Sequence, residues 1–405
     1  MSRQTYASSG HAYVILGAGK QGVAAAYDVI QHGQAARVTL ADNSLPFACA
    51  AIKKLKRIAA APIQKHQITL MAVSVDARKE SDLRRVIGGH DAALSALPYY
   101  LNPAVARAAV AEKVHYCDLG GYFEATREIM KLHASARRAG VTLVPDCGVA
   151  PGMCNSLAVS GMEHMTRVRD VRIYCGGLPL KPRPPLDYKV VFNLEGVLGN
   201  YFGKSYVLRN GKVQRVPSFS GREEISFGRF GTLEAVTTGG ATSTCPWTFR
   251  KTLRNYDYKT LRYPGHYDKI QFLKDLGLLE TSHVRVNGYR IVPREVFVAV
   301  IGPRLAFPRD RDLLIQRVVV YGELKGKKTE VTYDVLDTGD ARTGFTAMQR
   351  TTGFSAAIIL EMLAQGHILQ KGFVPVEKAV PGYVFLKEIR KRGIDVKERI
   401  RIEQK

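Results

Sequence analysis

The stretch Tyr13-Val14-Ile15-Leu16-Gly17-Ala18-Gly19-Lys20-Gln21-Gly22 decides the fold of this chain. Four apolar residues lead directly into the pattern G-x-G-x-x-G, and an amphipathic segment over 23–30 follows at once. This order predicts a strand, a glycine turn and a helix. In such a turn, Gly17 permits the tight bend, Gly19 lets a pyrophosphate approach the backbone, and Gly22 lets the helix pack close to the strand.

The next apolar run, over 37–41, ends in Asp42, twenty residues beyond Gly22. The N-terminus of the helix after the glycines predicts a phosphate site, because its free N–H groups and its dipole attract anions. Asp42 can accept hydrogen bonds from a ribose. An ordinary glycine turn in an α/β protein explains the glycines but leaves the acid at the end of the second strand unexplained. We therefore expect a dinucleotide site.

The expected dinucleotide is NAD. The Asp42 carboxylate would repel the 2′-phosphate of NADP, and the following residues, Asn43 and Ser44, supply no arginine to receive that phosphate.

Strands and helices alternate over the first 150 residues. Apolar runs at 68–73, 90–98, 114–118 and 141–145 are separated by segments with helical patterns. This alternation predicts a Rossmann-type, doubly wound parallel sheet, in which ligands bind beyond the carboxyl ends of the strands. The candidate cofactor-binding residues on that rim are Gly17, Gly19, Lys20, Gln21, Gly22, Asp42, Asp76, Ser95, Ala96, Leu97, Pro98, Leu119 and Gly120.

A second domain is expected where the pattern changes, past Pro151-Gly152. Segments with alternating polarity at 205–208, 225–227, 318–321 and 329–334 read as antiparallel strands. We therefore predict an α+β substrate-binding domain over 125–350. Residues 1–124 and 351–405 would form the NAD-binding domain, with an apolar helix over 353–366 and a last helix over 384–392 packing back on the first domain.

Composition indicates a globular protein of the reducing cytoplasm. The chain has 405 residues, 46% apolar and 23% charged, and no apolar run reaches the roughly 18 residues that a membrane span needs. The first twelve residues lack the apolar region of a secretory signal and are expected to form a loose leader. The six cysteines show neither a CxxC pair nor a zinc-like spacing, so we expect free thiols and no metal.

The formal net charge of +23 raises the question of an anionic partner. Lysines and arginines are spread through the whole chain, and the densest run, over 387–405, contains acidic residues as well. No basic motif with interleaved aromatic residues accompanies that run. The pattern favours a solvated basic surface over nucleic-acid binding.

Five stretches along the chain carry a resemblance to a known family. They are Ser95-Ala96-Leu97-Pro98-Tyr99-Tyr100, Tyr116-Cys117-Asp118-Leu119-Gly120-Gly121, Gly148-Val149-Ala150-Pro151-Gly152-Met153, Tyr174-Cys175-Gly176-Gly177-Leu178-Pro179 and Thr260-Leu261-Arg262-Tyr263. In this order and spacing the chain resembles the saccharopine dehydrogenase family along nearly its whole length. Within the family, 184–196 and 258–266 are most similar to the L-lysine 6-dehydrogenase type.

One motif departs from the members that form saccharopine. Those members usually carry G-L-D-P-G-x-D-H, whereas here Ala150 replaces the first Asp, and Cys154 and Asn155 replace the Asp-His pair. The departure argues against saccharopine as the substrate.

The resemblance implies hydride transfer from the ε-carbon of lysine to a nicotinamide, followed by hydrolysis of the imine and loss of ammonia. This chemistry needs an anion site for the substrate carboxylate, a base, and exclusion of water. Arg262 is the candidate carboxylate ligand, since guanidinium binds carboxylate bidentately. A structural ion pair is the alternative for Arg262.

Asp118 is the first candidate base, because it closes the fifth strand on the ligand rim, where desolvation would raise its pKa. Its alternative is a carboxylate that caps the turn at 119–121. Lys189 and His266 are further catalytic candidates. Tyr99 and Glu195 are candidates for binding substrate, with a packed aromatic and a structural salt bridge as their alternatives.

Three functions stay open at this point. One is a lysine 6-dehydrogenase, and another is a saccharopine or carboxynorspermidine dehydrogenase, which joins an amine to a carbonyl compound and reduces the imine. The third is a dinucleotide-binding sensor or nucleic-acid binder without catalysis. The resemblance also implies a homodimer or homotetramer.

Overall fold

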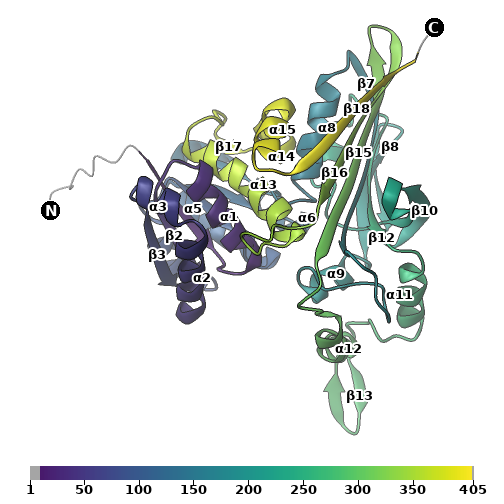
Figure 1. Cartoon of the computed structure of the whole chain (residues 1–405), viewed down its shortest axis with the longest axis horizontal. Helices are drawn as coiled ribbons and strands as arrows, with labels where there is room; N and C mark the ends of the chain where they lie inside the picture. Colours follow the sequence, from purple (N-terminus) through teal and green to yellow (C-terminus); the bar gives the residue numbers. More distant parts are fainter. Residues whose placement is uncertain (1–9, 404–405) are drawn as a thin grey trace, which may run out of the picture. The chain divides into compact units, whose positions relative to one another are not determined.

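The computed structural model describes residues 10–403. The chain divides into two compact units (Figure 1). Unit 1 contains residues up to 163 together with 341–345 and 349–394. Unit 2 contains 164–340, 346–348 and the residues from 395 onward. Most of the expected loose leader, residues 1–9, lies outside the described part of the chain.

Unit 1 is built on a seven-stranded parallel sheet of order β17-β6-β5-β4-β1-β2-β3. The strands are β1 (His11–Leu16), β2 (Ala35–Asp42), β3 (Thr69–Ser74), β4 (Ala92–Ser95), β5 (His115–Asp118), β6 (Thr142–Val144) and β17 (Gly372–Phe373). The order reverses between β1 and β4, so the crevice at the carboxyl end of β1 is where such sheets bind their ligands. The expected doubly wound parallel sheet is confirmed.

The sheet is covered by helices whose small apolar residues allow close packing. In α1 (Lys20–His32), a run of residues from Gly22 to Ile30 is buried. The other helices are α2 (Leu45–Ile58), α3 (Ala60–Lys65), α4 (Glu80–Ile87), α5 (Asn102–Ala111), α6 (Phe123–Met130), α7 (His133–Ala139), α8 (Met153–Glu163), α13 (Ala347–Ala364), α14 (Val376–Ala379) and α15 (Gly382–Lys391). A core cluster of buried apolar residues joins strands of this sheet to α4, α5, α6 and α7.

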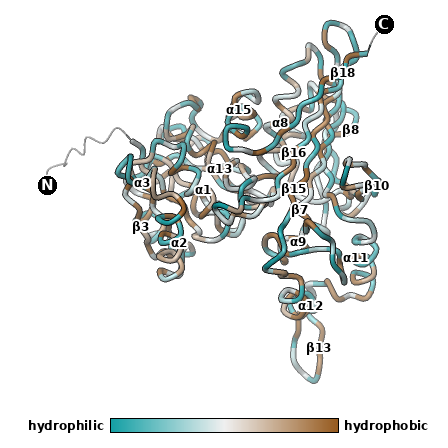
Figure 2. Tube along the Cα trace, viewed as in Figure 1, coloured by the Kyte–Doolittle hydropathy of each residue, from teal (hydrophilic) through white to brown (hydrophobic). Residues whose placement is uncertain are grey.

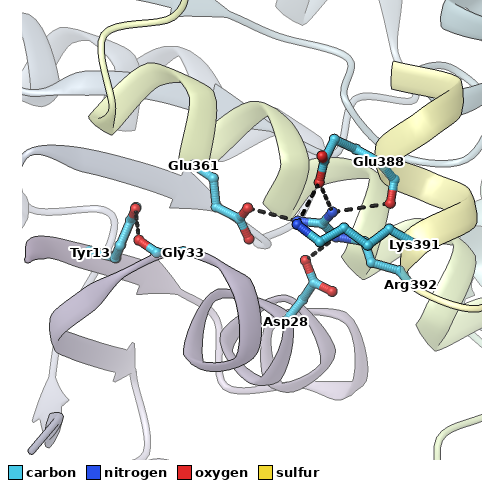
Figure 3. Close-up of polar contacts among 7 residues, drawn as sticks. All are labelled: Tyr13, Asp28, Gly33, Glu361, Glu388, Lys391 and Arg392. Atoms are coloured by element: carbon cyan, nitrogen blue, oxygen red, sulfur yellow. Dashed lines mark hydrogen bonds and ion pairs between the residues drawn. The ribbon is translucent and has the colours of Figure 1, made fainter. Parts of the chain in front are cut away.

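The C-terminal segment of unit 1 is attached by a buried ionic cluster (Figure 3). The Arg392 guanidinium donates to Asp28 on α1 at 2.6 Å, to Glu361 on α13 at 2.7 Å and to Glu388 on α15 at 2.6 Å. The side chains of Arg392, Asp28 and Glu361 are 1%, 2% and 7% exposed. Three helices that are distant in sequence are thereby joined through one side chain.

Unit 2 is built on a mixed sheet of order β10-β11-β12-β7-β15-β16-β18, in which β12 also pairs with β8 and β8 pairs with β9. Its strands are β7 (Arg167–Pro179), β8 (Lys204–Arg209), β9 (Lys212–Pro217), β10 (Ser220–Ser226), β11 (Thr232–Thr237), β12 (Asn255–Arg262), β15 (Asp312–Leu324), β16 (Lys327–Asp337) and β18 (Asp395–Ile402). Pairing is antiparallel except between β12 and β7. Figure 2 shows hydrophobic segments along β15 and β16, whose inner residues are buried.

The remaining elements of unit 2 are short. They are α9 (Leu194–Gly199), α10 (Cys245–Thr248), α11 (His266–Asp275), α12 (Pro293–Ile301) and a separate hairpin of β13 (Val284–Val286) and β14 (Tyr289–Ile291). In the part of the chain that the structure describes, no helix combines the length and apolar character that crossing a bilayer requires.

The compact units divide the chain at different points from the domains expected from sequence. Residues 125–163 lie in unit 1, because β6 extends the parallel sheet and α8 packs against α15. Residues from 395 onward lie in unit 2, because β18 pairs with β16. The division at 125 and 351 therefore stays a prediction about function, since it does not follow the compact units.

Candidate active site

The glycine turn of unit 1 has the geometry that each glycine was expected to provide. Gly17 has a φ of +101°, in the left-handed region that favours glycine. A Cβ at Gly22 would lie 1.9 Å from the carbonyl oxygen of Gly17, so the helix approaches the strand as closely as a glycine allows. A Cβ at Gly19 would meet no atom within 4 Å among the described residues. Space is therefore open at the residue where a pyrophosphate would approach.

The N-terminus of α1 is available to an anion. Gly19 precedes the helix without a capping side chain, and the first turn contains no acidic residue. These features fit a bound phosphate group, because the helix end presents N–H groups and a positive dipole with nothing of the chain neutralising it.

Asp42 lies beside this turn at the end of β2. Its Oδ2 accepts a hydrogen bond from the amide of Ala18 at 2.9 Å, and its Oδ1 accepts one from the amide of Ser44 at 3.1 Å. Each oxygen keeps capacity for a further donor, since a carboxylate offers about four acceptor positions. The residues of unit 1 thus fit a dinucleotide, with Asp42 placed for the adenosine ribose.

The other rim candidates divide into two kinds. The loop 95–98 packs against the glycine turn. The backbone N–H of Ala96 donates to the carbonyl of Leu16, and the carbonyl oxygen of Ala96 lies 2.7 Å from the position that a Cβ of Gly17 would occupy. Asp76 is instead held in a local ion pair with Arg78, whose hydrogen bonds lower the pKa of Asp76 to about 2. That pairing is compatible with a structural role for Asp76.

Asp118 lies at the end of β5 in a closed hydrogen-bond network. Its Oδ1 accepts from the amides of Gly120 at 2.8 Å and Asp146 at 2.9 Å, and its Oδ2 accepts from the Tyr116 hydroxyl at 2.7 Å. The residue is 1% exposed. Burial raises the pKa of Asp118 to about 6, although the three hydrogen bonds act in the opposite direction. The carboxylate joins two turns of unit 1, as in the turn-cap alternative, and its role as a base stays a prediction.

Arg262 occupies an unusual environment at the end of β12 in unit 2. It is 4% exposed, yet it forms no ion pair with any residue from 10 to 403. Its Nε donates to the Tyr201 hydroxyl at 2.9 Å and its Nη1 to the carbonyl of Leu261 at 2.7 Å. The guanidinium also lies over the rings of Tyr188 and Tyr201, at 4.9 and 5.9 Å from their centroids. Since buried charges are usually paired, a buried cation without a carboxylate is a candidate for binding an external anion, and this role of Arg262 stays a prediction.

His266, at the start of α11, belongs to the same cluster. Its Nδ1 lies 2.8 Å from the Leu186 carbonyl and its Nε2 lies 3.2 Å from the Tyr201 hydroxyl. Since a carbonyl can only accept, Nδ1 carries the proton, and the Tyr201 hydroxyl donates to Nε2 while accepting from Arg262. Burial, and then the charge of Arg262, lower the pKa of His266 to about 3. His266 is therefore a neutral acceptor at physiological pH.

The remaining candidates lie apart from this cluster or in structural contacts. Lys189 donates to the carbonyls of Ala306, at 2.8 Å, and Phe307, which ties two segments of unit 2 together. Glu195 is half exposed, and one of its oxygens lies 3.6 Å from Arg294. Tyr99, in unit 1, is 42% exposed and packs against the ring of Tyr122. The roles predicted for these three residues stay predictions.

Two tyrosines of the unit 2 cluster, Tyr188 and Tyr201, were not predicted from the sequence. Both are 1% exposed and line the Arg262 guanidinium. Nothing in their local sequence distinguishes them from core tyrosines, because their role depends on contacts with Arg262, which lies 74 and 61 residues further along the chain. Among the described residues, no group of three or more histidine, cysteine or acidic side chains is arranged to hold a metal ion.

The strand order, the glycine turn and the acid at the end of β2 together define a Rossmann-type dinucleotide-binding unit, joined to a mixed-sheet unit. The chain belongs to the saccharopine dehydrogenase family. Residues 13–144 match the family model described as the saccharopine dehydrogenase NADP binding domain, and residues 148–394 match the saccharopine dehydrogenase C-terminal domain. The resemblance to this family is confirmed, whereas neither match distinguishes the lysine 6-dehydrogenase type.

Curated relatives share part of their length with this chain. The mitochondrial alpha-aminoadipic semialdehyde synthase of Bos taurus is 25% identical over 408 residues, which covers 82% of this chain and 43% of the relative. The saccharopine dehydrogenase [NADP(+), L-glutamate-forming] of Saccharomyces cerevisiae is 29% identical over 153 residues, 36% of this chain and 34% of the relative. The chain thus spans less than half the length of these relatives in the matched regions.

A solved structure has the same fold along nearly the whole chain. It is apo saccharopine dehydrogenase (L-Glu forming) from Saccharomyces cerevisiae, with a TM-score of 0.75, 20% sequence identity, and coverage of 97% of this chain and 100% of that one. At this identity the likeness concerns the fold alone.

Proposed function

We propose that this protein is an NAD-dependent amino-acid dehydrogenase that oxidises the ε-amino group of L-lysine. The ε-carbon loses a hydride to the nicotinamide and the amine loses a proton. Water then adds to the imine, ammonia leaves, and the aldehyde allysine cyclises with its own α-amino group to Δ1-piperideine-6-carboxylate.

The observation that carries this proposal is the Arg262 guanidinium, which is buried and has no carboxylate partner among residues 10–403. Desolvating a guanidinium is costly unless an anion compensates for it. The α-carboxylate of an amino acid supplies that anion and can accept the N–H groups that Tyr201 and Leu261 leave free. Arg262 would thereby orient the substrate by its α-carboxylate end.

The side chains around Arg262 exclude water from the guanidinium, and their burial keeps His266 neutral. Tyr188, Tyr201 and Tyr267 are each 1% exposed and surround the guanidinium and His266. Since His266 stays neutral, it adds no second positive charge beside Arg262, and the affinity for one carboxylate is set by a single cation. His266 is thus proposed to fix the Tyr201 hydroxyl rather than to shuttle protons.

Unit 1 is proposed to hold the dinucleotide, which would supply the hydride acceptor. The amide groups at the start of α1 would bind the pyrophosphate, and Asp42 would accept hydrogen bonds from the ribose hydroxyls. NAD is proposed over NADP because a 2′-phosphate would meet the Asp42 carboxylate, which already accepts the Ala18 amide.

A second candidate is a saccharopine dehydrogenase. One observation favours it: curated relatives that match part of this chain bear that name. Saccharopine carries several carboxylates, so Arg262 would serve in this reaction as well. The curated name prints NADP(+), which makes cofactor preference part of the test.

The deciding experiment is a panel of L-lysine, saccharopine and other amino acids, each with NAD and with NADP, followed by nicotinamide absorbance. We expect turnover of lysine with NAD, without any second carbonyl substrate. Activity on saccharopine alone would favour the second candidate, and equal or better kcat/KM with NADP would remove the NAD assignment.

The substitution Arg262→Ala tests directly whether the buried guanidinium binds the substrate carboxylate. Loss of a desolvated charged contact costs on the order of 2–5 kcal/mol, so KM for lysine should rise by more than about fivefold, while the Kd for NAD stays within about twofold. The control is Lys204→Ala, which removes a cation from an exposed residue at the start of β8 in the same unit. A KM that changes equally in both variants would contradict the role.

A further inference from the structure

A basic groove lies on unit 2, away from the Arg262 cluster. Its volume is about 800 Å³. It is formed where β7 and β12 begin, between the turn that joins β8 to β9, the turn that joins β15 to β16, and the end of β18. In Figure 1, β15, β16 and β18 run side by side toward the C-terminus, as the strand pairing requires.

The lining of the groove carries an excess of positive charge. Its acidic residues are Glu323, Glu330 and Glu403, and its basic residues are Arg167, Arg169, Arg250, Lys251, Arg254, Lys328 and Arg401. Seven cations against three anions leave a local excess of four charges.

Several of these cations lack an ionic partner. Arg167, Arg250 and Lys251 are exposed and form no ion pair with any residue from 10 to 403. The guanidinium of Arg254 donates to the neutral side chain of Asn210 at 3.2 Å. By contrast, Lys328 pairs with Glu403 at 3.3 Å and lies at the rim. Unpaired cations of like sign repel each other when they gather in one concavity, so an anion entering the groove relieves that repulsion.

The chemistry of the groove selects the class of anion. The planar guanidinium of arginine binds phosphate and carboxylate oxygens through two parallel hydrogen bonds. Because the unpaired cations are several and lie apart, a ligand that neutralises them needs more than one anionic group. The volume is that of a site for a small molecule. Tyr321 is the one aromatic residue in the lining, whereas single-stranded nucleic acid is bound by several stacked aromatic side chains along an open track.

The groove is separate from the proposed substrate site. Arg254 directly precedes β12, and Arg262 is its last residue. Eight residues of strand span roughly 26 Å, so the two sites lie at opposite ends of β12. The inference does not depend on the proposed function.

We propose that this groove binds a small anion that carries several phosphate groups, of the size of a nucleotide. The ligand is a free polyphosphate or the phosphate chain of a nucleotide, and the two are separated by experiment because only the nucleotide carries a base.

The test is isothermal titration of the full chain with inorganic tripolyphosphate, and separately with ATP, each in the presence of saturating NAD so that the proposed phosphate site of unit 1 is already occupied. The groove variant is Arg167→Gln, Arg250→Gln and Lys251→Gln together. The matched control, Lys113→Gln, Arg127→Gln and Arg138→Gln, removes the same three charges from exposed residues of unit 1. Because all six side chains are exposed, both variants should fold, and circular dichroism checks this.

We expect tripolyphosphate to bind with one site per chain, at least tenfold more weakly in the groove variant and within twofold in the control. The ligand is a nucleotide if ATP binds more tightly than tripolyphosphate and if Tyr321→Leu removes that additional affinity without weakening the binding of tripolyphosphate. If ATP binds no more tightly than tripolyphosphate, the ligand is a free polyphosphate. Equal weakening in both triple variants, or the absence of binding at millimolar tripolyphosphate, would overturn the proposal. So would a single-stranded oligonucleotide that binds in preference to either probe and loses affinity only in the groove variant, since the groove would then serve nucleic acid.

Discussion

The cost of burying a guanidinium explains why Arg262 stands out among the 59 cationic residues of this chain. Most of the others are exposed or ion-paired, so water or a carboxylate compensates for their charge. Arg262 is compensated by a tyrosine hydroxyl, a carbonyl and two aromatic faces, which together provide less than a carboxylate would. A residue of this kind retains affinity for an anion, which is the physical basis of the proposed substrate site.

One substitution distinguishes the two interpretations of Asp118, as a general base and as the cap of a turn. In Asp118→Asn, the remaining oxygen can accept both amide hydrogen bonds. The new amide can donate to the Tyr116 hydroxyl, which lies 3.3 Å from the alternative acceptor, the Asn102 carbonyl. The fold should therefore persist. A base in the reaction predicts a fall in kcat of roughly 10²–10⁴-fold, whereas a turn cap predicts nearly unchanged kcat.

The same substitution predicts a pH dependence of stability. Because the folded-state pKa of Asp118 is raised from 3.8 to about 6, its stabilising contribution is complete below about pH 4 and is lost as the pH rises through about 6. The difference in unfolding free energy between wild type and Asp118→Asn should therefore shift in favour of the variant between pH 4 and 7. Denaturant titrations at several pH values measure it, and a shift in the opposite direction would show that Asp118 is not desolvated.

Single residues also show what the sequence could predict about the site. Arg262 and His266 were both expected from sequence, and the structure brings them together through Tyr201. The neutral state of His266 was not predictable, since it results from burial and from the charge of Arg262. Local motifs identify reactive residue types, whereas their protonation states depend on contacts made between distant segments.

At the scale of elements, the turn between β1 and α1 offers a matched pair of substitutions. Gly19 has extended backbone angles, with φ of −72° and ψ of −172°, and open space where a Cβ would be. Gly19→Ala should leave the thermal midpoint within about 2 °C of wild type. It should still weaken NAD binding by tenfold or more, because the methyl group enters the path of the pyrophosphate.

Gly22→Ala is the comparison. Its Cβ would lie 1.9 Å from the Gly17 carbonyl oxygen, so α1 must move away from β1 and the thermal midpoint should fall by several degrees. Differential scanning fluorimetry and titration with NAD measure both variants. An unchanged Kd for NAD in Gly19→Ala would contradict the assignment of this turn as the phosphate site.

The cluster around Arg392 predicts how α1, α13 and α15 depend on one another. Arg392→Met leaves Asp28 and Glu361 buried without a cation, which should destabilise unit 1 by about 3–5 kcal/mol. Burial raises the pKa of both carboxyl groups, so protonation relieves the uncompensated charge and the deficit should shrink as the pH falls from 8 to 5. Urea unfolding across that range measures the effect.

The control for this cluster is Lys391→Met, which removes an exposed cation 3.8 Å from Glu388 and should cost less than about 1 kcal/mol. Equal losses in the two variants would mean that the buried contacts add nothing beyond surface charge.

Helices and strands could be predicted from the sequence where their burial requires a regular pattern of apolar residues. Six of the seven strands of the parallel sheet are short apolar runs, and they were located within a few residues, whereas the two-residue strand β17 (Gly372–Phe373) was too short to be predicted. The edge strand β18 was not predicted, because its sequence Asp-Val-Lys-Glu-Arg-Ile-Arg-Ile resembles a solvated tail. An edge strand tolerates charged side chains since its main chain provides the pairing, here with β16.

For the whole molecule, the charge of +23 has two physical consequences. It attracts anionic ligands over a distance of about a Debye length, roughly 8–10 Å in physiological salt, and it concentrates where cations gather without partners. Both proposed anion sites of unit 2 are of that kind, one buried around Arg262 and one exposed in the groove. Their separation along β12 means that a substitution in one should leave the other intact.

The division into two units leads to the last prediction, which concerns hydrogen exchange across the whole chain. NAD should protect amides most strongly in the glycine turn, over 17–23, because their N–H groups would bind the pyrophosphate. L-Lysine should protect most strongly the segment 262–267, where Arg262 and His266 lie. Exchange followed by mass spectrometry, with each ligand alone, measures both effects. Gly19→Ala should remove only the first and Arg262→Ala only the second. Protection of 262–267 by lysine that persists in Arg262→Ala would contradict the substrate site, and the cofactor site would be unaffected by that result.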